Sequence, residues 1–109
     1  MEKGGYIYIL SSKGRRLYVG VTSELFVRVK KHKAKAYPDS FTARYNIDRL
    51  VYYEAFSSIE EAIARETVIK NMHRTRKIAL IVGLNPTVEP FDESRMRPQL
   101  RFGGKPEGS

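Results

Sequence analysis

The segment YIYILSSKGRRLYVG, residues 6–20, constrains the fold of this chain more than any other feature. Two runs of alternating side chains flank turn-forming serine, lysine and glycine, and this pattern predicts an antiparallel hairpin. Alternation places Tyr8 on one face of the first strand, while Tyr18 and Gly20 share a face of the second. The pattern alone leaves open whether these tyrosines are ordinary strand residues or groups aimed at a substrate.

The remainder of the chain adds helical periodicity and one more strand-like run. Thr22 and Ser23 offer an N-cap to the first helix. Ser58 followed by Glu61 fits a capping box for the second helix, and Thr75 offers a cap to the third. The predicted strands cover residues 6–11, 16–21 and 49–56, and the predicted helices cover residues 24–36, 58–72 and 76–82. The order β-β-α-β-α-α predicts an α+β fold, in which helices flank a small, three-stranded, mostly antiparallel sheet.

The 109 residues fit a single domain, which we expect to span residues 1–88. Residues 89–109 contain several prolines and glycines and are expected to form a poorly ordered tail. The chain has no cysteine, which excludes disulfides, thiolate zinc sites and cysteine nucleophiles. It shows neither a signal peptide nor about 18 consecutive apolar residues, so we expect a cytoplasmic protein with no membrane span.

The formal net charge of +8 favours a polyanionic partner. Beyond residue 88 the basic and acidic residues cancel, so the surplus lies within the predicted domain. A basic composition also serves solubility. Charge therefore makes nucleic acid a candidate partner without selecting it.

The predicted helix over residues 24–36 carries a row of cations. Arg28, His32 and Lys35 are spaced by four and then three residues, so they share one helical face, and Lys31 lies beside them. The helix can therefore present a cationic ridge to a substrate. The alternative interpretation is a solvated basic face with no specific partner.

Glu66 stands where the apolar stripe of the second predicted helix should continue. That stripe consists of Ile59, Ala62, Ile63 and Ile69. An inward carboxylate is costly unless it is paired or binds a cation. Glu66 is therefore expected to pair with Lys70, to mark the ragged edge of the stripe, or to hold a metal ion.

Other kinds of catalytic site lack support in the sequence. The chain contains no Walker-type loop, no GxGxxG and no HExxH, and its two histidines lack a metal-ligand spacing. A non-enzymatic alternative is a sheet whose tyrosines bind single-stranded nucleic acid by stacking.

Taken together, these motifs resemble the GIY-YIG nuclease superfamily. The similarity is greatest to its small single-domain bacterial members, which are close to the catalytic part of structure-specific and excision-repair nucleases. The matching positions are Tyr6-Ile7-Tyr8, Tyr18-Val19-Gly20, Arg28, His32, Glu66 and the pair Asn85-Pro86. Two departures are mild: Tyr6 replaces the first glycine and Val19 replaces isoleucine, whereas the functional tyrosines and Gly20 are present.

The resemblance implies a divalent-metal-dependent endonuclease that hydrolyses DNA phosphodiester bonds in repair or recombination. It implies that Glu66 binds Mg²⁺ or Mn²⁺, that Arg28 grips the scissile phosphate, and that Tyr8 acts as general base. Because the pKa of a free phenol is near 10, the resemblance further implies that Arg28, the metal ion, or His32 accepting the proton makes Tyr8 a usable base. It also implies that Tyr18 positions water or phosphate. Gly20 is expected to allow close backbone approach, and Asn85 is a possible accessory residue. The lysines expected to follow the DNA backbone are Lys30, Lys31, Lys33 and Lys35.

Two alternatives share this fold. The chain is then a non-catalytic basic module that binds nucleic acid, or a subunit whose activity requires a protein partner that supplies specificity. RNA is an alternative substrate to DNA.

Overall fold

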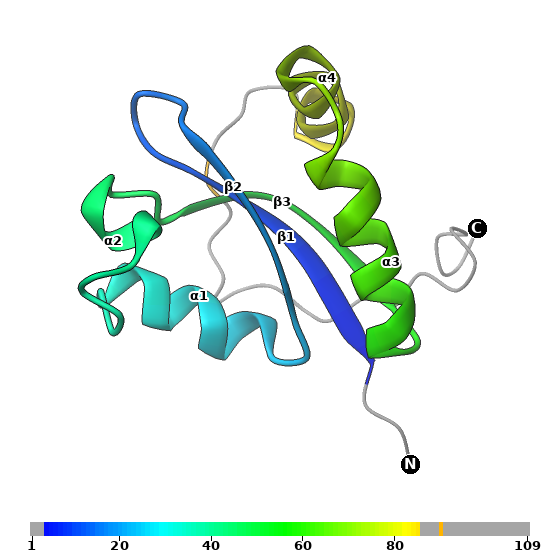
Figure 1. Ribbon diagram of the computed structural model, residues 1–109, viewed down its shortest axis with the longest axis horizontal. Helices are drawn as coiled ribbons and strands as arrows, with labels where there is room; N and C mark the ends of the chain where they lie inside the picture. The colour runs from blue at the N-terminus through cyan, green and yellow to red at the C-terminus, as the bar shows by residue number, and fades with distance from the viewer. Residues whose placement is uncertain (1–3, 86–89, 91–109) are drawn as a thin grey trace.

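A three-stranded antiparallel sheet forms the centre of the computed structural model, which describes residues 4–85 and 90 (Figure 1). The elements in chain order are β1 (Gly5–Ser11), β2 (Leu17–Thr22), α1 (Leu25–Lys33), α2 (Phe41–Arg44), β3 (Arg49–Phe56), α3 (Ile59–Lys70) and α4 (Arg74–Leu84). This arrangement confirms the predicted α+β fold and adds one short helix, α2. The predicted tail lies outside the described residues, except for Pro90.

The hairpin predicted at the start of the chain is present, with β1 at the centre of the sheet order β2-β1-β3. The turn is closed at Ser12, whose backbone carbonyl accepts from the backbone N–H of Arg15 at 3.0 Å and whose hydroxyl accepts from that of Arg16 at 3.0 Å. Register places Tyr8 directly opposite Gly20. Tyr8 of the first strand and Gly20 of the second are therefore cross-strand neighbours.

A β-bulge interrupts the pairing of β1 with β3. Ile9 pairs with Tyr52 while the next residue, Leu10, pairs with Leu50, so Val51 is the extra residue. As a result Val51 and Tyr52 belong to the same hydrophobic cluster, whereas Leu50 belongs to the opposite one. A bulge leaves backbone groups without a partner in the ladder, and here the side-chain amide of Asn85 donates to the Val51 carbonyl at 3.2 Å.

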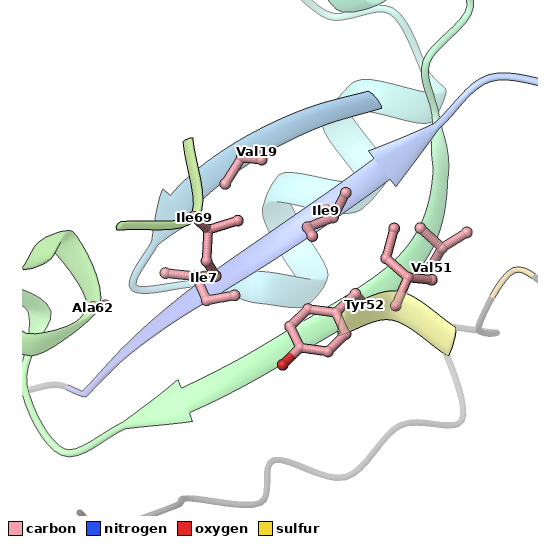
Figure 2. Packing of buried hydrophobic residues seen from close by; sticks show 8 residues of the cluster. Ile7, Ile9, Val19, Val51, Tyr52, Ala62 and Ile69 are labelled. Atoms are coloured by element: carbon pink, nitrogen blue, oxygen red, sulfur yellow. The ribbon is translucent and has the colours of Figure 1, made fainter. Parts of the chain in front are cut away.

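The sheet has a separate hydrophobic cluster on each face. On the face covered by α3 and α4, Ile7 and Ile9 pack with residues from both helices (Figure 2). The members of this first cluster are Ile7, Ile9, Val19, Val51, Tyr52, Ala62, Ile69 and Ile81. On the opposite face lies the second cluster, made of Tyr8, Leu10, Leu25, Val29, Ile47 and Leu50. Tyr8 therefore lies on the opposite face of the sheet from Ile7 and Ile9, and it faces α1.

Helix α1 is shorter than predicted. It begins at Leu25, after Glu24, and the predicted cap Thr22 instead accepts a hydrogen bond from the backbone N–H of Glu24 at 3.0 Å. It ends at Lys33, and Lys35 has a left-handed backbone with φ of 53°. Lys35 therefore does not share a helical face with Arg28 and His32, and that part of the prediction is wrong.

The caps of the other helices also differ from expectation in part. Ser58 caps α3 by accepting from the backbone N–H of Glu61 at 3.2 Å, but the Glu61 carboxylate accepts from serine hydroxyls instead of returning to the backbone. Helix α4 begins at Arg74 with His73 as N-cap, so Thr75 lies inside it. Helix α2, absent from the prediction, is capped by Ser40, whose hydroxyl accepts from the backbone N–H of Ala43.

Candidate active site

Tyr8 and His32 form a buried hydrogen-bonded pair between the sheet and α1. Tyr8 is 1% exposed and His32 is 7% exposed. The Tyr8 hydroxyl lies 3.1 Å from His32 Nε2. Leu25, Val29 and His32 follow the helical spacing i, i+4, i+7 and are all buried, so His32 continues the apolar stripe of α1. His32 is therefore buried, and it is not part of the exposed cationic ridge that the sequence predicted.

The second ring nitrogen of His32 contacts α2, which the sequence did not predict. His32 Nδ1 lies 3.0 Å from the hydroxyl of Thr42, and that hydroxyl lies 3.1 Å from the Ser40 hydroxyl. Thr42 is buried. The only sequence signal for this contact was the cap pattern of serine followed by phenylalanine, threonine and alanine, which is too short for a periodicity argument. Thr42 is therefore a site residue that sequence reasoning missed.

Tyr18 and Gly20 of β2 complete the aromatic part of the site. The Tyr18 ring centroid lies 6.3 Å from that of Tyr8 and 5.7 Å from that of His32. A Cβ added to Gly20 would lie 2.5 Å from both Cζ and the hydroxyl oxygen of Tyr8. Glycine at this position therefore makes room for the Tyr8 ring. The expected close approach of a substrate backbone at Gly20 stays a prediction.

The charge of Arg28 acts on both Tyr8 and His32, and the charge of Glu66 acts on Tyr8. Burial raises the pKa of Tyr8, and the neighbouring Tyr18 and the charge of Glu66 raise it further, whereas the charge of Arg28 lowers it. Burial lowers the pKa of His32, and the charge of Arg28 lowers it again. Near neutral pH the pair is therefore a protonated phenol beside a neutral imidazole. The structure thus brings Tyr8, Tyr18, Arg28, His32 and Glu66 into one region.

Glu66 is half-buried on α3, between the buried residues Ala62 and Ile69. Its carboxylate Oε2 lies 3.2 Å from Nζ of Lys70, which is the first of the three explanations that the sequence allowed. Ile63, assigned to the apolar stripe from the sequence, is exposed instead.

The residue next to Glu66 anchors α3 to the sheet. Arg65 donates to both carboxylate oxygens of Glu54 on β3, at 3.1 Å each, and the Tyr52 hydroxyl donates to the same carboxylate. Two hydrogen bonds from one guanidinium fix orientation as well as distance. The two hydrogen bonds from Arg65 to Glu54 therefore limit how α3, and with it Glu66, can rotate relative to the sheet.

A single protein carboxylate, that of Glu66, suits a metal ion that keeps most of its coordinated water molecules. Within residues 4–85 and 90, no three His, Cys, Asp or Glu side chains gather in a way that could hold a metal ion. Mg²⁺ is commonly bound through one or two carboxylates together with substrate phosphates and water. Glu66 alone fits such a site, provided that Lys70, which is largely exposed, releases the carboxylate.

The remaining predicted residues lie around this centre or apart from it. Lys30, Lys31 and Lys33 are exposed on α1, and Lys35 is exposed beyond its end. Asn85 is the C-cap of α4 and contacts β3 on the opposite side of the sheet from α1. Its position gives it a structural role at the bulge, and an accessory role in catalysis stays a prediction.

The order and spacing of these residues match a known family. A model of the GIY-YIG catalytic domain matches residues 4–79 of the chain. The chain belongs to the GIY-YIG family. GIY-YIG domains are nuclease domains, so membership implies DNA binding.

Several members of this family are similar to the chain over most of their length. A UPF0213 protein of Clostridium perfringens is 38% identical over 92 residues, which cover 81% of this chain and 94% of that protein. A UPF0213 protein of Staphylococcus haemolyticus is 39% identical over 80 residues, which cover 70% and 92%. The solution NMR structure of a UPF0213 protein from Bacillus halodurans is 34% identical, with a TM-score of 0.48, and the match covers 84% of this chain and 94% of that one.

One sequence-based interpretation changes with this structure. Tyr8 is buried under α1, so the central strand does not offer its ring as an open stacking surface for nucleic-acid bases. None of the helices in the described part of the chain has the length and hydrophobicity that crossing a bilayer requires.

Proposed function

We propose that this GIY-YIG protein is a divalent-metal-dependent endonuclease that hydrolyses DNA phosphodiester bonds. The observation that carries the proposal is the buried Tyr8–His32 hydrogen bond, set beside the charges of Arg28 and Glu66. A module that only binds DNA needs surface cations and gains nothing from a buried phenol–imidazole pair next to an inward carboxylate.

Tyr8 and His32 divide the work of removing a proton from the attacking water. A phenol whose pKa is raised by burial is a poor base unless its own proton can leave. His32 is neutral because its pKa is lowered, so Nε2 can accept that proton when Nδ1–H donates to Thr42. The proton then moves from water to Tyr8 as the Tyr8 proton moves to His32.

Arg28 stabilises the charge that develops on the phosphate. Its planar guanidinium can donate two parallel hydrogen bonds to phosphate oxygens. The same charge lowers the pKa of both Tyr8 and His32, which favours the phenolate form of Tyr8 and keeps His32 neutral before the reaction. Removing a donor of this kind typically slows a reaction by roughly a hundredfold or more.

Glu66 is the residue that would hold the metal ion, Mg²⁺ or Mn²⁺. When bound, the ion supplies Lewis-acid stabilisation of the phosphate and the leaving oxygen. Lys70 neutralises the Glu66 carboxylate before binding. The site therefore favours metal and DNA arriving together, because the phosphate supplies ligands that the protein lacks.

The lysines of α1 supply affinity without sequence recognition. Lys30, Lys31 and Lys33 are exposed on the helix that carries His32, and Lys35 follows it. Contacts of this kind go to the phosphate backbone and weaken as salt rises. Selection of a target then depends on DNA structure, as in repair or recombination intermediates, or on a protein partner.

A cleavage assay with matched variants tests the proposal. Labelled nicked, branched, flapped and plain duplex DNA, and an RNA of the same sequence, are incubated with Mg²⁺ or Mn²⁺. Tyr8→Phe and Glu66→Gln are expected to lose activity, by roughly 10²- to 10⁴-fold for the general base. Tyr6→Phe, on the same strand face, and Glu60→Gln, exposed on α3, serve as controls.

Each outcome has a distinct meaning. Cleavage that survives in Glu66→Gln removes Glu66 as metal ligand. Binding without cleavage of any substrate identifies a nucleic-acid-binding module, or a subunit that needs its partner.

A further inference from the structure

The segment that connects α1 to β3 exposes three large aromatic side chains. Tyr37 is 43% exposed, Phe41 is 49% exposed and Tyr45 is 38% exposed. Single exposed aromatics are common on protein surfaces. Here two of them are in contact, because the ring centroids of Phe41 and Tyr45 lie 4.9 Å apart with an angle of 55° between the planes.

Basic residues lie beside Tyr45, the second member of this Phe41–Tyr45 pair. The guanidinium carbon of Arg16, in the turn between β1 and β2, lies 4.1 Å from the centroid of the Tyr45 ring, and exposed Arg44 precedes Tyr45 in the chain. Tyr45 also lines an open cavity of about 540 Å³. The other lining residues are Ser12, Lys13, Gly14, Asn46, Asp48 and Arg49, in which two cations exceed one carboxylate. The surface therefore combines flat apolar rings with positive charge.

The Phe41–Tyr45 pair is adjacent in the chain to a residue of the candidate active site, Thr42. Phe41 stands between Ser40 and Thr42, and the Thr42 hydroxyl contacts Nδ1 of His32. Consecutive Cα atoms are about 3.8 Å apart. The segment that carries Phe41 and Tyr45 is thus joined to Tyr8 through Thr42 and His32, so a nucleotide next to a phosphate bound at Arg28 and Tyr8 would approach this segment.

We propose that Phe41 and Tyr45 form a platform on which an unpaired base of the substrate stacks, next to the cleaved bond. The proposal rests on the endonuclease function proposed above and deepens it by naming the substrate class. Stacking needs an open base face, which a nucleotide in a flap, gap or single strand offers and one within a continuous duplex does not. The positive charge of Arg16 over the Tyr45 ring, and of Lys13 and Arg49 in the adjoining cavity, suits the flanking phosphates.

A tryptophan reporter measures the stacking directly. The chain contains no tryptophan, so Phe41→Trp introduces a single indole whose emission falls when a base stacks on it. The probes are a single-stranded oligonucleotide, the same strand with abasic sites, and a blunt duplex, all in metal-free buffer. Quenching by the intact single strand, and much less by the other two, is the expected result.

A matched reporter and an affinity measurement complete the test. Val82→Trp places the indole at an exposed position on α4, on the other side of the sheet, where no quenching is expected. Phe41→Ala is expected to reduce the selectivity for flapped over blunt DNA by roughly 5- to 150-fold, the range that aromatic–base stacking provides. Circular dichroism checks that each variant is folded.

The outcomes separate this proposal from the proposed function. Equal quenching by intact and abasic strands, or by blunt duplex, overturns the platform, because the phosphates alone then explain the signal. Base-dependent quenching in a protein that cleaves nothing supports the platform and contradicts the nuclease. Cleavage without base-dependent quenching does the reverse.

Discussion

Gly20 is the position where one added methyl group should disturb both the fold and the site. A Cβ at this residue would lie 2.5 Å from Cζ and from the hydroxyl oxygen of Tyr8, and 2.9 Å from Cε1. Ordinary contact begins at 3.4 Å, so the ring must recede by about 0.9 Å. Tyr8 is buried and bonded to His32, so the ring has no open space in which to move.

The expected change in the free energy of unfolding for Gly20→Ala combines two destabilising effects and one stabilising effect. Overpacking of a core typically costs about 1–3 kcal/mol. Displacing the ring also weakens the Tyr8–His32 hydrogen bond, a net contribution of about 0.5–1.5 kcal/mol. Alanine restricts the unfolded chain and returns about 0.4–1 kcal/mol. We therefore expect Gly20→Ala to lower the free energy of unfolding by about 0.5–4 kcal/mol, equivalent to a Tm lower by about 2 °C or more.

The same substitution at Gly83 provides the control. Gly83 lies in α4, and a Cβ there meets nothing within 4 Å. Gly83→Ala is therefore expected to raise the Tm, because alanine is favoured over glycine in a helix by about 0.5–1 kcal/mol. Thermal unfolding followed by far-ultraviolet circular dichroism measures both variants. A Gly20→Ala protein with the Tm of the parent would show that the Tyr8 ring is not held against β2, and the reasoning on this site would fail.

Three further predictions concern the contacts of His32 and Asn85. Thr42→Val should slow cleavage and move the acidic limb of the pH–rate profile to lower pH, because protonated His32 loses a hydrogen-bond acceptor. Thr42→Ser keeps the hydroxyl and should retain the parental profile. Since the pKa of His32 is lowered, the unfolded chain binds more protons below about pH 6.5, so stability should fall on acidification by at most about 1.4 kcal/mol per pH unit. Urea unfolding across this range should show a smaller slope for His32→Gln. Asn85→Ala removes the hydrogen bond that the side-chain amide donates to the Val51 carbonyl and should cost about 1–3 kcal/mol in the same assay.

The strands were the most predictable part of this fold. The predicted bounds of the third strand, residues 49–56, match those of β3 at both ends. The run Leu-Val-Tyr-Tyr within it is rich in residues that favour a pleated, half-buried surface. The bulge at Val51 was not foreseen, since a single extra residue leaves alternation intact on either side of it. Helix α2 was missed for a related reason: four residues give too short a window for a helical period.

Most of the residues that the structure brings together in the candidate site were predictable from the sequence, but their geometry was less so, and their functional roles stay predictions. Helical spacing placed Glu66 near a buried stripe, and Ala62 and Ile69 on either side are indeed buried, but spacing could not select Lys70 as its partner. For His32 the spacing to Arg28 suggested an exposed ridge. Its neighbours in space come from 24 residues earlier and 10 residues later in the chain, and these distant contacts decide which face of α1 is buried.

Burial of Tyr8 sets the chemistry that the proposed reaction needs. Because Tyr8 is 1% exposed, the most direct route for the phenol proton is through a hydrogen-bonded neighbour. His32 is that neighbour, and its lowered pKa keeps it neutral and able to accept. The same burial raises the pKa of Tyr8, which makes the proton harder to remove until positive charge accumulates beside it. Arg28 already lowers the pKa, and Glu66 raises it until a cation neutralises the carboxylate. In the proposed reaction, Tyr8 would therefore become an effective base only when a metal ion on Glu66 joins Arg28, which would couple water activation to assembly of the complete site.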